Sequence, residues 1–258
     1  KTSTNSAKIY NSLSGELQVR AQRLPEGAKR DSMLADAEVA SARANEIYPE
    51  YANAWLIMGN IRFLLHDDMQ GAVKAYSNHL AYKPGSFDGF YNLGKVYVKY
   101  EKPRQAVNYL KKALEQRELL EIKYLIGNGY TDLGMADSAI YYYKDILADN
   151  PNQHLALYRI GLVHGKVRND LPKSIEWLKR ATQAAPNEVT YHEDLGVAYG
   201  LARELEKAVE QFTRVTELNP NYAKAYYNLG LTYQQLGNEV KAMENFRKAQ
   251  KLGMQMPQ

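Results

Sequence analysis

The chain has 258 residues, of which 45% are hydrophobic and 24% are charged. This balance is typical of a folded protein and is too apolar for an intrinsically disordered chain. The 33 basic and 29 acidic residues are interspersed, and the formal charge of +4 is too small to indicate a nucleic-acid partner. Because the sequence has no cysteine, a disulfide framework, a thiol nucleophile and a thiolate metal site are excluded.

At the start of the chain, the pattern predicts two helices separated by a Pro-Glu-Gly turn. The first, over roughly residues 6–24, has no recurring motif. The second carries Ala37, Ala44 and Pro49 at a spacing that recurs further along the chain. We therefore expect residues 1–51 to form a divergent first repeat or an N-terminal cap.

From residue 52 onward the sequence repeats itself. Six glycines recur at intervals of 35, 33, 34, 35 and 34 residues, and a small residue follows each glycine 12 or 13 positions later. The glycines are Gly59, Gly94, Gly127, Gly161, Gly196 and Gly230. The small residues are Ala72, Ala106, Ala139, Ser174, Ala208 and Ala242. A fixed period of this length predicts a stack of similar supersecondary units, each too small to bury its own apolar face.

Each unit is expected to be two amphipathic helices joined by a short turn, because its apolar residues recur at three and four positions. In the last unit, Tyr226, Leu229 and Tyr233 lie on one stripe of the first helix, and Phe246 lies on the second. Gly237 stands between them, where a left-handed residue ends a helix. The recurring small residues are expected to let the two backbones approach where the helices cross.

These motifs resemble the tetratricopeptide repeat, whose first helix carries an aromatic residue, Leu-Gly and Tyr, and whose second carries Ala, an aromatic residue, Ala and Pro. The resemblance implies an all-α fold, a right-handed superhelical α-solenoid. Its units would span residues 52–86, 87–119, 120–153, 154–188, 189–222 and 223–256, as one continuous solenoid. Two units depart from the pattern, since Arg62 and His164 replace the tyrosine and each of these units has one extra turn residue.

The sequence shows no constellation of residues that would make the chain an enzyme. The five histidines are scattered, no metal-binding spacing occurs, and no glycine-rich phosphate loop follows a strand. His164 and His192 stand at positions that are usually aromatic, so they are interpreted as packing residues. No catalytic residue, metal or cofactor is therefore predicted.

The first helices offer a candidate binding surface instead. Repeat positions 2, 5, 9 and 12 form a stripe beside the one that faces the paired helix, and stacked units would line these stripes into a concave groove. The predicted peptide-binding residues are Asn60, Tyr91, Lys95, Tyr124, Asn128, Tyr158 and Tyr227. The alternative is that the tyrosines only support stacking. The clamp with which some family members grip a C-terminal carboxylate is not reproduced, because Leu56 precedes Asn60 and Tyr91 precedes Lys95.

Two functions remain open at this point. The first is a scaffold that binds a peptide or partner protein in the groove. The second rests on residues 5–11, which resemble the junction before the extracytoplasmic repeats of multi-pass membrane O-mannosyltransferases. In that case the chain would be a substrate-presenting arm, in the periplasm or its equivalent; otherwise the compartment is undetermined. No direct insertion of this segment into a membrane is expected, whereas self-association through an uncapped last repeat is.

Overall fold

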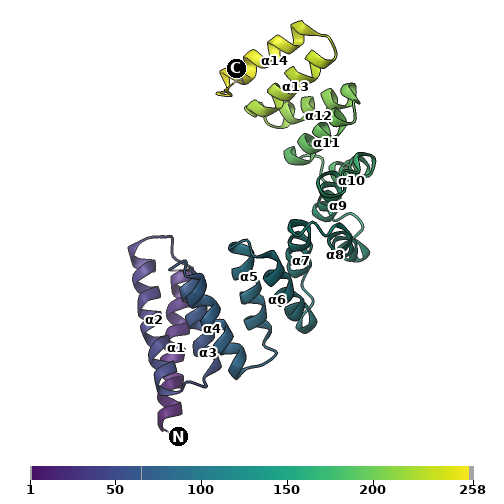
Figure 1. Cartoon of the computed structure of the whole chain (residues 1–258). Coiled ribbons are helices and arrows are strands. Elements are labelled where there is room, and N and C mark those ends of the chain that lie inside the picture. Colours follow the sequence, from purple (N-terminus) through teal and green to yellow (C-terminus); the bar gives the residue numbers. More distant parts are fainter. Residues whose placement is uncertain (1, 65, 256–258) are drawn as a thin grey trace. The chain divides into compact units, whose positions relative to one another are not determined.

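The computed structural model describes residues 2–64 and 66–255, and every regular element within them is a helix (Figure 1). In chain order the helices are α1 (Thr2–Gln22), α2 (Ala28–Ile47), α3 (Ala52–Leu64), α4 (Met69–Tyr82), α5 (Phe87–Lys99), α6 (Pro103–Gln116), α7 (Leu120–Asp132), α8 (Ala136–Asp149), α9 (His154–Leu162), η1 (Val163–Val167), α10 (Leu171–Ala184), α11 (Val189–Leu201), α12 (Leu205–Leu218), α13 (Ala223–Gln235) and α14 (Glu239–Lys251). The all-α prediction is confirmed. Met256, the last residue of the last predicted repeat, lies outside the described residues.

The chain divides into two compact units, which we call unit 1 (Lys1–Leu133) and unit 2 (Gly134–Gln258). Unit 1 contains α1 to α7, and unit 2 contains α8 to α14. Within each unit, successive helices pack as hairpins, and each hairpin packs on the next (Figure 1). Continuation of the two units as one solenoid remains a prediction.

On five of the first helices, the recurring glycine makes room for one large side chain of the second helix. A Cβ built on Gly59 would lie 2.5 Å from the Tyr76 ring, and one on Gly230 would lie 2.5 Å from the Phe246 ring. The same relation joins Gly94 to Leu110, Gly161 to Leu178 and Gly196 to Phe212. The large residue always follows the recurring small residue by four positions, one helical turn. The space beside each of these five glycines is therefore filled by the large residue of the second helix.

The turns inside the repeats each contain one residue with a left-handed backbone. Their φ values lie between 48° and 73°, at Asp67, Glu101, Gly134, Asn169, Arg203 and Gly237. Gly237 has the conformation that the sequence predicts. Four of the six positions, however, carry a side chain, which raises the backbone energy by roughly 1 kcal/mol each.

The extra residue of the two longer repeats is accommodated at these turns. In an ordinary repeat, the Glu204 N–H donates to the Tyr199 carbonyl at 2.9 Å, which spans five residues. The corresponding bond spans six residues in the longer repeats: Asp68 N–H donates to Arg62 O at 3.0 Å, and Asp170 N–H to His164 O at 2.8 Å. After α9 the insertion forms a π-helical turn, η1, a common outcome when one residue is added to a helix.

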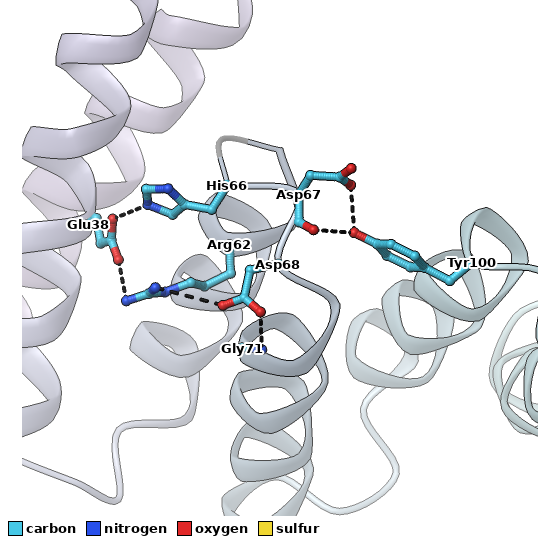
Figure 2. A network of polar contacts seen from close by, with 7 residues as sticks. All are labelled: Glu38, Arg62, His66, Asp67, Asp68, Gly71 and Tyr100. Atoms are coloured by element: carbon cyan, nitrogen blue, oxygen red, sulfur yellow. Dashed lines mark hydrogen bonds and ion pairs between the residues drawn. The ribbon is translucent and has the colours of Figure 1, made fainter.

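The first hairpin is longer than the others, with 21 residues in α1 and 20 in α2. It joins the repeats partly through a polar network at the α3–α4 turn (Figure 2). There the Glu38 carboxylate on α2 lies 2.5 Å from Arg62 and 2.6 Å from His66. Asp68 caps α4 by accepting a hydrogen bond of 2.9 Å from the Gly71 N–H. Among the described residues, no helix has the length and apolar character needed to cross a membrane.

Candidate functional site

On the first-helix face of unit 1, Asn60 and Lys95 line the same cavity of about 230 Å³. The Asn60 Oδ1 accepts hydrogen bonds from the Tyr76 hydroxyl at 2.7 Å and from Asn92 Nδ2 at 3.2 Å. These bonds hold the amide plane and occupy its carbonyl oxygen, so the Asn60 NH₂ group is the part left for a ligand. Lys95 is exposed. The structure thus brings two of the predicted residues together, one repeat apart.

Tyr91 does not line this cavity, and its ring packs against neighbouring side chains. Its ring stacks on Phe87 with the centroids 5.4 Å apart, and Lys95 Nζ lies 5.2 Å from the Tyr91 centroid. Burial, followed by a hydrogen bond with Glu121, raises the pKa of the Tyr91 hydroxyl to about 12. Tyr91 therefore stays neutral and also positions the Lys95 ammonium group.

The other two predicted residues of unit 1, Tyr124 and Asn128, lie on α7 and are half-buried. They follow Tyr91 and Lys95 by one repeat, at equivalent positions of the next first helix. Both side chains are partly exposed, so a ligand could contact them. They do not belong to the Asn60 cavity, whose lining contains no residue of α7.

In unit 2, Tyr158 has a packing role. Only 8% of the residue is exposed, and its ring stacks on Tyr191 with the centroids 4.3 Å apart. The hydroxyl donates a 2.6 Å hydrogen bond to Asp194 Oδ2, and burial together with this bond raises the pKa of Tyr158 far above its usual value. At this position the structure favours the alternative interpretation of the tyrosines. Tyr227 is half-buried beside Phe246, with centroids 5.8 Å apart.

Other first-helix residues that contact a neighbouring helix or line a cavity lie one position beyond the predicted stripe of repeat positions 2, 5, 9 and 12. Repeat position 6 supplies Asn92, Asp194 and Asn228, which contact the preceding first helix or a cavity beside it. Position 13 supplies the exposed Leu201. Positions 2, 6, 9 and 13 are separated by four, three and four residues, so they share a helical face. This spacing is the signal that would have identified them.

Two adjoining cavities lie on the first-helix face of unit 2, and we call them together the apolar trough. Their volumes are about 310 Å³ and 130 Å³, and both are lined by Val197 and Leu201. Val197 is 39% exposed and Leu201 is 66% exposed. Leu162 on α9 and Leu231 on α13 extend the apolar lining to either side.

Within the part of the chain that the structure describes, no group of histidine, aspartate and glutamate could hold a metal ion. The buried His79 and His192 have hydrogen-bond partners, whereas Nδ1 of the buried His164 has none among the described residues. The two ring nitrogens of His79, for example, lie 2.8 Å from the Ala52 carbonyl and 2.7 Å from the Ser86 hydroxyl.

Comparisons with known proteins agree with this architecture. Models described as the tetratricopeptide repeat match residues 91–189 and 223–252, and one described as the TPR repeat matches residues 204–237. MamA from Desulfovibrio magneticus RS-1 is a similar solved structure, with 26% identity, a TM-score of 0.58, and coverage of 64% of this chain and 94% of that chain.

A second solved structure, of YrrB, is described as a TPR protein with an unusual peptide-binding site. It is 22% identical, with a TM-score of 0.58, and the match covers 72% of this chain and 95% of that chain. No curated protein sequence gives a significant match. Together with the repeated glycine, the small residue and the helical hairpins, these matches show that the chain belongs to the tetratricopeptide repeat family.

Proposed function

We propose that this chain is a protein-interaction scaffold that binds a peptide, or a segment of a partner protein, on the first-helix face of its repeats. The observation that carries the proposal is the cavity where the side chains of Asn60, Asn92 and Lys95 converge. Two amides and one exposed ammonium group suit the carbonyl oxygens and carboxylates of a polypeptide. YrrB, with the same fold, has a peptide-binding site according to its description.

In this proposal the predicted residues have different roles. Polar contacts to the ligand come from Asn60, Lys95 and Asn128. Ring faces come from Tyr91, Tyr124 and Tyr227, because aromatic rings bury a large area at a small cost in side-chain entropy. Tyr158 acts indirectly by bridging α9 and α11. A groove of this kind is expected to bind with a Kd of about 1 μM, or about −8 kcal/mol.

The test compares two lysines of unit 1. Lys95 on α5 lines the cavity, whereas Lys111 on α6 is exposed on a second helix. A random peptide library is selected on the purified chain, and the affinities of the selected peptides are measured by fluorescence anisotropy. We expect Lys95→Glu to weaken binding at least about fivefold, roughly 1 kcal/mol, and Lys111→Glu to leave it unchanged.

The two variants undergo the same charge change, so a general electrostatic effect would weaken both equally. That result, or the failure of the library to yield any binding peptide, would contradict the proposal. Circular dichroism checks that both variants are as helical as the parent chain.

A further inference from the structure

The apolar trough of unit 2 differs in chemistry from the polar cavity of unit 1. We infer that the trough binds an extended peptide segment that carries apolar side chains and an acidic group. This inference rests on the proposed function and adds the class of ligand. It concerns only α9 to α13, which lie within unit 2.

The lining of the trough explains the apolar part of the ligand. Leu162, Val197 and Leu231 occupy the same repeat position on three successive first helices, where unit 1 has Asn60 and Lys95. Exposed Leu201 adds to this surface. Covering an exposed apolar surface beside a cavity with an apolar group of a ligand lowers the free energy, because apolar area is removed from water.

Gly200 leaves the trough open. It lies within α11 and lines the larger cavity, yet a Cβ built on it would meet no atom within 4 Å. The glycine at position 8 of the same helix is different, because a Cβ on Gly196 would lie 2.7 Å from the Phe212 ring. Packing within the chain therefore requires Gly196, whereas a ligand would use the space at Gly200.

Asn228 supplies a hydrogen-bond donor for the backbone of such a ligand. Its counterpart at the same repeat position in unit 1, Asn92, donates to Asn60 on the preceding first helix. The residue that corresponds to Asn60 beside Asn228 is Val197, which has no acceptor, and Asn228 Nδ2 has no hydrogen-bond partner among the described residues. Because Asn228 lines the larger cavity, a rotation of its side chain would let this buried nitrogen donate to a peptide carbonyl.

The charges at the trough select for an acidic ligand. Lys166 lines the smaller cavity and Arg203 the larger one, and both are exposed. The one carboxylate in either lining is that of Asp194, which already accepts the hydrogen bond of Tyr158. The linings therefore hold two cationic side chains and one carboxylate, a balance that favours a ligand with a carboxylate.

The probe is a short synthetic peptide, labelled with fluorescein, that alternates leucine and serine and ends in aspartate. Alternate side chains of an extended peptide share one face. In one control probe serine replaces every leucine, and in a second lysine replaces the aspartate. Binding is measured by fluorescence anisotropy with the full chain. We expect the first probe to bind at least about tenfold more tightly than either control probe.

The substitution Gly200→Leu fills the trough with a side chain. We expect it to weaken the affinity for the first probe by about tenfold or more. Gly15→Ala on α1 is the matched control, because its new Cβ would lie in ordinary contact, 3.6 Å from Ile57. A double variant, Lys166→Glu with Arg203→Glu, is expected to reverse the preference between aspartate and lysine. Leucine has a volume similar to that of asparagine but no hydrogen-bond donor. Asn228→Leu is therefore expected to weaken the binding of both probes that contain leucine.

Two results would overturn the inference: equal binding of all three probes, or full binding to a folded Gly200→Leu variant. If Lys95-dependent binding of library peptides persists in either case, the proposed function stands and only the ligand class is wrong. If no peptide of any composition binds the chain, both the inference and the proposed function fail.

Discussion

The Tyr158 hydroxyl donates a hydrogen bond of 2.6 Å to Oδ2 of Asp194, one repeat further along the chain. This bond joins the first helices of neighbouring repeats, α9 and α11. The same relation occurs in unit 1 between Asn92 and Asn60, which join α5 to α3. Hydrogen bonds between neighbouring first helices therefore line the surface that we propose as the binding face.

Tyr158→Phe tests the packing role of this tyrosine. Removing the hydroxyl leaves Asp194 without this hydrogen bond, so we expect a loss of about 1 to 2 kcal/mol in the free energy of unfolding. Urea unfolding followed by circular dichroism measures the change. Tyr141→Phe in the same unit is the control, since Tyr141 is exposed and should give a change near zero. Equal effects of the two substitutions would show that the bond to Asp194 contributes nothing.

Glu101→Gly is expected to stabilise unit 1 by up to about 1 kcal/mol, because glycine adopts a positive φ without steric cost. Glu101 has φ 52° and is exposed. Asp67→Gly should give a smaller gain or a loss, since Asp67 at φ 48° also binds Lys99 and Tyr100 of the next repeat. The urea midpoints of the two variants, compared with that of the parent chain, measure both changes in stability. A destabilised Glu101→Gly variant would show that the positive φ of Glu101 has no steric cost that glycine relieves.

The stability of the chain is expected to fall as the pH decreases below about 6.5, the ordinary pKa of histidine. Burial lowers the pKa of both His79 and His164 in the folded chain, and Arg168 lowers that of His164 further. The unfolded chain therefore takes up protons at a pH where the folded chain does not, and this favours unfolding. Above pH 7 both states are neutral and the contribution is absent.

His164→Phe keeps a ring at a position that is 5% exposed and removes the titrating group. We expect this variant to lose less stability than the parent chain between pH 7 and pH 5. Thermal unfolding at a series of pH values measures both slopes. Identical slopes would mean that His164 is not coupled to folding.

Glu38→Gln tests the network at the α3–α4 turn (Figure 2). The Glu38 side chain is 18% exposed and its carboxylate faces both Arg62 and His66. We expect a loss of about 1 kcal/mol, because the neutral amide cannot compensate the charge of Arg62. The difference between variant and parent should shrink at high salt, which screens ion pairs. A difference that is independent of salt would point to a packing effect instead.

The fold could be predicted from the sequence because its determinants are local and repeated. Gly59 and its five counterparts, with a small residue at a constant distance, identify the helical hairpins without any long-range contact. The left-handed turns were harder to predict from the sequence. Glycine indicates such a conformation, but Glu101 and Arg203 adopt it without being glycine. Their conformation is imposed by the hairpin geometry, not by the residue type.

The candidate site could be predicted only in part. The helical period placed Asn60 and Lys95 on one face, and they line one cavity. The period could not show that Tyr158 binds Asp194, because that contact depends on how successive first helices pack. For the same reason the apolar trough, which depends on the space beside Gly200, was found only in the structure.

The most direct test of the binding face uses the absence of cysteine from the chain. A single cysteine is introduced by Lys95→Cys on α5 or by Lys111→Cys on α6, and the rate of its alkylation is measured with and without a saturating peptide from the library selection. We expect the peptide to slow alkylation at position 95 and to leave the rate at position 111 unchanged. Protection at position 111 with none at position 95 would contradict it, because the ligand would then lie on the second helices.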